Sequence, residues 1–342
     1  MTSRERLCMA MLGGEPDRVP VGPHGWGHVD PDSAVGAEML ARLDMMLPVG
    51  GGSSPFWSAG VVMHTVRDAD SAVTTLDTPA GELRQVWRRT SITQAVTEHF
   101  CKTADQLQAV IELPYEPAAP SLDDYHRWCQ RVGDEALIMV GVGDGICHIA
   151  DLCSPEDLCL LWADAPDLML AAVNTAHQRT LAWVEACCRA GAKAFRIIGG
   201  EYATTQLGPR GFEALCVAQD RELCALMRSY GAISYYHNHG TTMAFTSQFA
   251  RIAMDALDPL EGPPYGDADL ARCRAEMPAV CMVGNLDDME QIEAWDHDRL
   301  RTLAAERLAQ AGRRAFVLGG TASGTYTEAG ARGFMALLDV VG

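Results

Sequence analysis

The chain has 342 residues and a formal net charge of -18 at pH 7, from 45 acidic residues against 27 basic ones. This excess of negative charge repels nucleic acid and anionic membrane surfaces, and no run of Lys and Arg reverses it locally. Hydrophobic residues make up 48% of the chain, yet no uninterrupted apolar run is long enough to span a bilayer. We therefore expect a globular protein with a small-molecule substrate, and the polar first residues favour a cytoplasmic location.

Twelve cysteines are scattered along the chain without a Cys-x-x-Cys pair. A structural zinc knuckle or a thioredoxin-type site is therefore not expected. Several of the cysteines lie inside apolar patterns, which is typical of small core residues in a reducing compartment.

The first predicted elements are a helix at residues 4–12, ended by Gly13 and Gly14, and a strand at residues 18–22. From residue 136 onward, apolar strand-like runs alternate with amphipathic helical stretches. Strands are predicted at residues 136–142, 194–198, 233–237, 256–260, 279–284 and 315–318. Helices are predicted at residues 155–162, 167–190, 211–229, from about 242, and at 268–276, 298–311 and 329–340.

This alternation predicts an α/β fold with parallel strands and helical crossovers. A single (β/α)8 barrel over residues 1–342 fits better than an open doubly wound sheet, because no Gly-x-Gly-x-x-Gly follows the first strand. Residues 81–89 alternate like an exposed antiparallel strand, so we expect a β-hairpin insertion at about residues 78–97 rather than a second domain.

Two histidines, His237 and His239, end a run that is typical of a β-strand. Side chains on a strand alternate faces, so these two imidazoles point the same way and can bind one metal ion. The alternative is a pair of surface or hydrogen-bonded core histidines. A third ligand is expected from Glu201, at the end of the preceding predicted strand. Such a set suits zinc, and also ferrous iron or manganese.

Catalytic side chains of a (β/α)8 barrel come from the C-terminal ends of its strands. The candidates for catalysis are His24, His28, Asp144, Glu261 and Asn285, and Asp287 lies near them in the sequence. The candidates for substrate binding are Trp26, Arg196, Tyr202 and Tyr265. Each of these residues by itself is as compatible with a loop cap or a solvated side chain, and it is their convergence on one end of the strands that indicates a site.

Residues 3–21, 255–261, 266–270 and 283–287 resemble, in order and spacing, segments of the uroporphyrinogen decarboxylase superfamily. The similarity covers nearly the whole chain and is greatest to the branch of cobalamin-dependent and thiol methyltransferases. It implies a (β/α)8 barrel with the active site in the strand-end cleft, and a homodimer, which is common in the superfamily.

The methyltransferase branch carries a zinc motif of the form His-x-Cys with a further Cys near the last strand. His237 matches the first ligand, but His239 stands at the first Cys position and residues 318–321 contain no Cys. Neutral imidazoles leave more positive charge on a metal than thiolates do, so a thiol acceptor is not expected. The decarboxylase branch uses an arginine-rich loop where this chain has residues 23–28 without arginine, so uroporphyrinogen itself is not an expected substrate.

Three functions follow from these patterns. The first is a zinc-dependent methyltransferase that moves a methyl group between a small methylated substrate and a corrinoid or other small acceptor; the chain has no Asp-x-His-x-x-Gly sequence, so cobalamin would come on a partner corrinoid protein or free. The second is a metal-assisted decarboxylase or lyase, with Arg196 or Arg210 binding a small carboxylic acid and His24 or His28 transferring a proton. The third is a corrinoid- or metal-binding module without catalysis.

Overall fold

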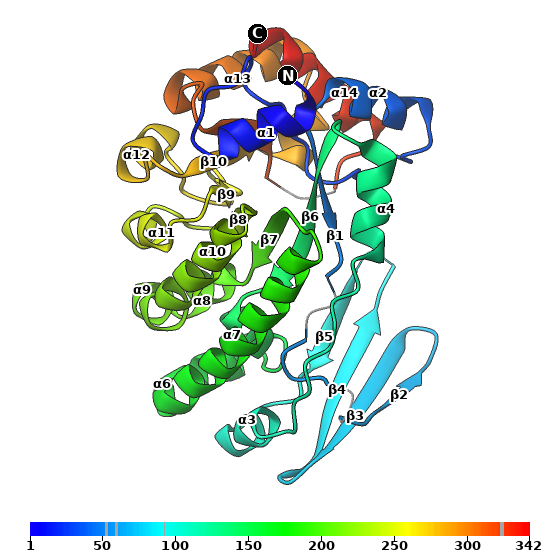
Figure 1. Ribbon diagram of the computed structural model, residues 1–342, viewed down its shortest axis with the longest axis vertical. Helices are drawn as coiled ribbons and strands as arrows, with labels where there is room; N and C mark the ends of the chain where they lie inside the picture. Colours follow the sequence, from blue (N-terminus) through cyan, green and yellow to red (C-terminus); the bar gives the residue numbers. More distant parts are fainter. Residues whose placement is uncertain (52–53, 59–60, 92, 322–324) are drawn as a thin grey trace.

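The computed structural model describes residues 1–51, 54–58, 61–91, 93–321 and 325–342 (Figure 1). Its larger sheet has seven parallel strands in the order β1-β6-β7-β8-β9-β10-β11. They are β1 (Met45–Val49), β6 (Ala136–Gly143), β7 (Ala194–Ile198), β8 (Ile233–His237), β9 (Ala256–Asp258), β10 (Cys281–Leu286) and β11 (Phe316–Gly320). The predicted α/β fold with parallel strands is confirmed at this level.

Helices surround this curled sheet (Figure 1). They are α1 (Ser3–Met11), α2 (Ala34–Arg42), α3 (Ala104–Ile111), α4 (Asp123–Val132), α5 (Gly145–Ala150), α6 (Pro155–Asp164), α7 (Pro166–Arg189), α8 (Gly200–Gln206), α9 (Gly208–Phe212), α10 (Ala218–Ser229), α11 (Thr246–Ile252), α12 (Leu270–Glu276), α13 (His297–Ala311) and α14 (Glu328–Ala336). Shorter turns are η1 (Glu213–Val217), η2 (Asp288–Ile292) and η3 (Leu337–Val340). The helix predicted at 211–229 therefore contains a π-helical turn.

The strand predicted at residues 18–22 is replaced by two single bridges. Val21 bridges Leu318 of β11, and His24 bridges Met46 of β1, both in parallel orientation. Pro20 and Pro23 lack the N–H groups that a regular ladder needs, which explains why no strand is assigned here. The segment nevertheless touches both edge strands of the sheet, and β1, which the sequence pattern did not predict, lies beside it.

Buried side chains form an inner cluster within the curl of the sheet and an outer cluster beneath the helices. Neighbouring residues of β8 show the division, because Tyr235 belongs to the inner cluster and Tyr236 to the outer one. Helix α1 contributes Leu7 to the inner cluster. Its flanking hydrogen bonds, from Arg4 N to Asp134 O and from Ala315 N to Gly14 O, place it at the N-terminal ends of β6 and β11. The C-terminal ends of the strands are left for a site.

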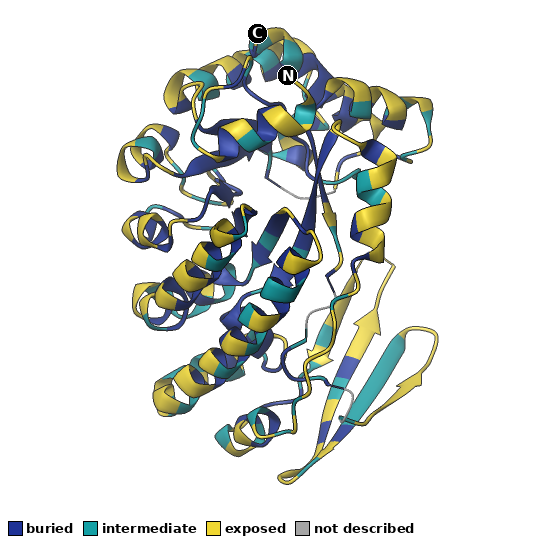
Figure 2. Cartoon of the chain, in the orientation of Figure 1, coloured by how far each residue is buried: buried dark blue, intermediate teal, exposed yellow. Residues whose placement is uncertain are grey.

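The insertion is a four-stranded antiparallel sheet rather than a hairpin. Its strands are β2 (Met63–Arg67), β3 (Ser71–Thr78), β4 (Gly81–Arg89) and β5 (Gln94–Glu98). The predicted antiparallel pairing of residues 81–89 is confirmed, but the boundary at 78 is wrong, because β2 and β3 precede it. Strand β2 is exposed along its whole length (Figure 2), so it lacks the alternation of apolar residues that would have revealed it.

Among the described residues, no helix is both long and apolar enough to cross a lipid bilayer.

Candidate active site

Strand β8 carries the two central histidines to the C-terminal edge of the sheet. His237 is the last residue of β8 and pairs in register with Asp258, the last residue of β9. Both side chains are buried. His239 follows two residues later and is about half exposed, with 42% of its side chain accessible.

Each imidazole is held by a carboxylate. His237 Nδ1 donates to Asp258 Oδ2 at 2.8 Å, and His239 Nδ1 donates to Glu261 Oε1 at 3.1 Å. The second oxygen of Glu261 accepts a hydrogen bond of 2.6 Å from the backbone N–H of Gly240. The two rings lie edge to face with centroids 4.5 Å apart. A carboxylate on Nδ1 fixes the proton there, so the lone pair on each Nε2 is available for a ligand.

The charges around Asp258 keep it ionised in spite of its burial. Burial alone raises its pKa, but the hydrogen bond from His237 and the positive charge of Arg196 outweigh this and lower the pKa below its ordinary value. Burial lowers the pKa of His237, against the effect of Asp258, whereas the hydrogen bond with Glu261 raises the pKa of His239. His237 thus helps to hold Asp258 as a carboxylate, whereas Glu261 favours the protonated form of His239, from which a metal would have to displace the Nε2 proton.

Two further polar side chains near this pair have no hydrogen-bond partner on key atoms. His24 is buried, stacks on the ring of Tyr235 with centroids 6.1 Å apart, and has an unpartnered Nε2. Burial lowers the pKa of His24 to about 3, against the attraction of Asp258, so its imidazole is neutral. Arg196, which pairs in register with Tyr235, has a buried and unpartnered Nε. Buried polar atoms without partners are typical of ligand-binding positions.

A second cluster lies on the helix side of the sheet. Asp144, Cys216 and Asp220 are all buried and bring one ligand atom each within 4.8 Å of one another, so these three side chains could hold a metal ion. Tyr236 Oη donates to Asp220 Oδ2 at 2.7 Å, and Cys147 N donates to Asp144 Oδ1 at 2.8 Å. The other oxygen of Asp144 has no partner.

The two acids of this cluster face each other without a compensating cation. Burial raises the pKa of Asp220 to about 7, against the effect of the hydrogen bond from Tyr236, and burial together with the charge of Asp220 raises the pKa of Asp144 well above its ordinary value. In the absence of a metal the pair is expected to share a proton. The backbone is closely fitted around them, since a Cβ added at Gly199, where φ is +147°, would lie 1.8 Å from Asp144 Oδ1.

The profile of the uroporphyrinogen decarboxylase (URO-D) family matches residues 88–341. The chain belongs to this family. A methyltransferase from Methanosarcina mazei has a similar structure, with a TM-score of 0.65 over 99% of this chain and 98% of that one, at 16% sequence identity. Identity at this level shows a shared fold. None of the curated proteins searched matches the sequence.

The predicted metal ligands of this URO-D family chain lie at the same end of the sheet. Glu201 is in the first turn of α8, after β7, and its Oε2 is buried without a partner. Its charge acts on both His237 and His239. Within the described ranges, the Asp144 cluster is the set of three side chains that comes within 4.8 Å. The assignment of His237, His239 and Glu201 to one ion therefore stays a prediction.

The predicted catalytic residues do not all lie at the histidine pair. His24 and Glu261 lie against the histidine pair. Asn285 donates from Nδ2 to Leu260 O at 2.6 Å and fixes the turn after β9. Asp144 belongs to the second polar cluster, with Cys216 and Asp220. It caps α5, and its side chain turns back to the backbone of that helix.

His28 is also apart from the pair. It is exposed, and its backbone N–H donates to Tyr326 O.

The predicted substrate-binding residues are similarly dispersed. Arg196 faces the histidine pair, whereas the ring of Trp26 packs on that of Trp128 with centroids 6.2 Å apart. Tyr265 is 54% exposed and donates its hydroxyl to Glu290. Tyr202 lines a separate large cavity. Asp258 was missed because the predicted strand ran to residue 260 and placed this residue inside it, whereas β9 ends at Asp258.

Proposed function

We propose that this protein is a metal-dependent methyltransferase in which His237 and His239 bind a divalent cation, zinc in the first instance, through their Nε2 atoms. The observation that supports this most directly is the pair of carboxylates on the two Nδ1 atoms. Metal-binding histidines commonly donate their second N–H to a carboxylate, which fixes the tautomer and the ring orientation. Here Asp258 and Glu261 supply that arrangement twice within one site.

The surrounding residues fit a metal as well. Glu201 offers a buried carboxylate oxygen without a partner, and burial lowers the pKa of His237, which favours the neutral form that binds a cation. A bound zinc ion would act as a Lewis acid on the oxygen or sulfur that carries the methyl group of a small substrate. Arg196 and His24 point unpartnered polar atoms into the same region and would orient that substrate.

The methyl acceptor would be a corrinoid, carried by a partner protein or free, or another small acceptor. The fold similarity to a methyltransferase supports this reaction class. We further infer that residues 20–25, which bridge β11 and β1, complete a (β/α)8 barrel over residues 1–342. A cytoplasmic homodimer remains the expected state.

A second candidate is a metal-assisted decarboxylase or lyase that acts on a small carboxylic acid. The observation in its favour is the unpartnered guanidinium Nε of Arg196, which suits a carboxylate. His24, neutral and without a partner on Nε2, would move the proton. Turnover without any cobalamin would favour this reaction over methyl transfer.

Elemental analysis of the purified protein and its variants tests the metal. We expect about one equivalent of a divalent metal per chain. His237→Ala should lose it, whereas His126→Ala, a change of an exposed histidine on α4, should retain it. If the protein holds no stoichiometric metal, the proposal fails. If Asp220→Asn removes the metal while His237→Ala keeps it, the ion belongs to the second polar cluster instead.

A further inference from the structure

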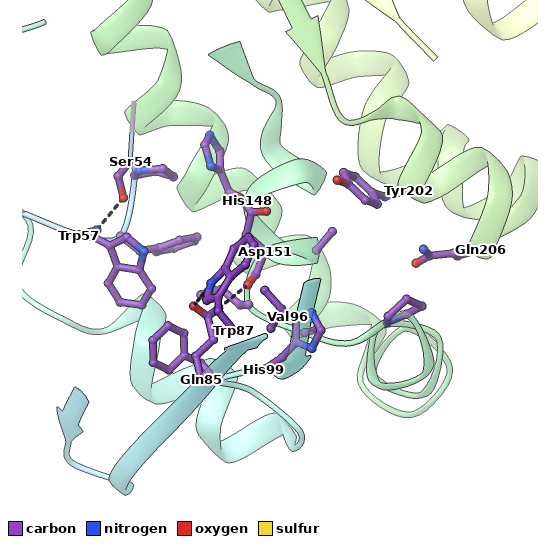
Figure 3. Close-up of a pocket in the computed structure, with 17 residues that line it drawn as sticks. Ser54, Trp57, Gln85, Trp87, Val96, His99, His148, Asp151, Tyr202 and Gln206 are labelled. Atoms are coloured by element: carbon purple, nitrogen blue, oxygen red, sulfur yellow. Dashed lines mark hydrogen bonds between the residues drawn. The ribbon is translucent and has the colours of Figure 1, made fainter. Parts of the chain in front are cut away.

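A large cavity lies between the inserted sheet and the C-terminal ends of β6 and β7 (Figure 3). It has a volume of about 560 Å³, within the range of small-molecule sites. Gln85, Trp87 and Val96 come from the insertion, while His148 and Tyr202 come from α5 and α8, the helices that follow β6 and β7. The cavity therefore exists because the insertion folds against the barrel-like sheet.

Aromatic rings form much of its wall. Trp57 packs edge to face on Phe100 with centroids 5.5 Å apart, and also contacts Phe56. Trp87 lies on the insertion side and remains 40% exposed. Flat apolar walls of this kind favour a planar aromatic ligand, since stacked and edge-to-face ring pairs add to the effect of burying area.

The polar atoms of the cavity indicate an uncharged ligand with one hydrogen-bonding group. His148 is 8% exposed and its Nε2 has no partner; Gln206 Oε1 is likewise buried and unpartnered. Burial lowers the pKa of His148 to about 4, so the imidazole is neutral. Among the described lining residues there is no Lys or Arg, so an anionic ligand would find no counter-charge here. The single carboxyl group among them, that of Asp151, belongs to an exposed residue.

The walls are fixed by hydrogen bonds before any ligand arrives. Trp87 Nε1 donates to Gln85 Oε1 at 3.1 Å, and Gln85 Nε2 donates in turn to the carbonyl of Asp151 at 3.4 Å (Figure 3). This chain of contacts ties β4 to the end of α5. On the opposite wall, Trp57 N donates to Ser54 Oγ at 3.1 Å. A site held in this way does not need to be ordered by its ligand.

We propose that this cavity is a binding site for an uncharged, planar aromatic molecule that carries a hydroxyl or ether oxygen. The rings of Trp57, Trp87 and Phe100 hold the aromatic plane. The oxygen-bearing group is bound by His148 Nε2 or, if it donates, by Gln206 Oε1. The site does not depend on the metal at His237.

Calorimetric titration with naphthol, its saturated analogue decalol and the anion naphthoate tests this site. Naphthol should bind one site per chain, and decalol should bind about tenfold more weakly because it cannot stack. Naphthoate should not bind measurably. The proposal is overturned if naphthoate or decalol binds as tightly as naphthol, or if naphthol does not bind.

Variants locate the binding. Trp87→Ala changes a partly exposed side chain and should weaken naphthol binding about fivefold to tenfold. Trp128→Ala, on α4 and outside the cavity lining, is the matched control and should leave binding unchanged. His148→Leu should weaken binding of naphthol but not of naphthalene, which has no hydroxyl. Equal affinities in folded wild-type and Trp87→Ala proteins would contradict the site.

The same titration on His237→Ala separates the two proposals. Naphthol affinity should be unchanged in this variant, whatever its metal content. A loss of naphthol binding together with the metal would show that the cavity is not an independent site and would contradict this inference.

Discussion

The inner acid cluster is the histidine pair with Asp258 and Glu261, and the outer acid cluster is Asp144, Cys216 and Asp220. Asp258 and Asp220 are buried to the same depth, but their pKa values shift in opposite directions. Asp258 is 2% exposed and its pKa is lowered, whereas Asp220 is 1% exposed and its pKa is raised to about 7. Asp258 faces an imidazole and lies near Arg196, while Asp220 faces a second acid. Equal burial therefore does not give equal ionisation, because the partners of Asp258 offset the effect of burial on its pKa and those of Asp220 do not.

The comparison also separates two kinds of candidate metal site. The inner cluster presents two imidazole Nε2 atoms whose rings are anchored from behind by Asp258 and Glu261. The outer cluster has three donors gathered within 4.8 Å, but one acid already accepts a hydrogen bond from Tyr236. The first is built to present ligands, and the second is satisfied largely by its own protons and hydrogen bonds.

The largest expected effect is on metal affinity at the inner cluster. Asp258→Asn removes the charge that holds the Nδ1 proton of His237, and we expect metal affinity to fall roughly 10- to 100-fold. Competition with a chromophoric chelator measures this. Glu261→Gln is the matched comparison and should cost less, because His239 is more exposed than His237. Unchanged affinity in Asp258→Asn would place the metal elsewhere.

The next effect is on stability at the outer cluster. Asp220→Ala leaves the buried hydroxyl of Tyr236 without its partner and opens a space beside Asp144, and should lower the free energy of unfolding by about 2–3 kcal/mol. Asp220→Asn keeps the shape and the acceptor, and removes the acid that raises the pKa of Asp144. It should leave stability at pH 7 unchanged or higher. Urea denaturation measures both, and a cost of Asp220→Asn equal to that of Asp220→Ala would contradict a protonated pair.

The pH dependence of stability gives a third test. The pKa of Asp220 rises from its ordinary 3.8 to about 7 on folding, and Asp144 shifts in the same direction. The folded protein holds protons that the unfolded chain has released, so this contribution is full below about pH 4 and is lost as the pH rises through about 7.

Urea midpoints measured between about pH 4 and 8 should therefore include a falling component in the wild-type protein. That component should be absent from the double variant Asp144→Asn/Asp220→Asn. Parallel curves for the two proteins would show that the acids are ionised, as they would be around a bound cation.

The smallest effect is that of one hydroxyl. Tyr236→Phe removes the hydrogen bond to Asp220 and should cost about 1 kcal/mol of stability. Tyr230→Phe is the control, since its hydroxyl binds Glu185, whose side chain is 40% exposed, and it should change stability by only a few tenths of a kcal/mol. Equal losses of stability for the two changes would show that the buried hydrogen bond from Tyr236 to Asp220 stabilises the fold no more than the exposed one from Tyr230 to Glu185.

Particular residues show which features of the candidate site could be predicted from the sequence. The alternation of side chains along β8 predicted that His237 and His239 share a face, and the rule of strand ends pointed to Glu261 and His24. The same rule misplaced Asp144, because a residue just beyond a strand can turn to either side of the sheet. In the structure its role as the N-cap of α5 turns it outward.

The inserted sheet shows a different limit. The alternation of side chains along residues 81–89, which form β4, is a clear local pattern, and it was predicted. Strand β2 is exposed on both faces, and it pairs with β3 through backbone hydrogen bonds. Backbone hydrogen bonds require no pattern of apolar side chains, so the sequence did not indicate this strand. The cavity against α5 and α8 depends in turn on that sheet.

By itself the sequence determined the parallel α/β architecture, the membership of the family and the side of β8 on which the histidines lie. These are consequences of local periodicity and of short segments, which act within a few residues. The tertiary structure decided which carboxylate faces which partner. Asp258 and Glu261 are 21 and 22 residues from the histidines that they hold, and only the register between strands and loops brings them to hydrogen-bond distance.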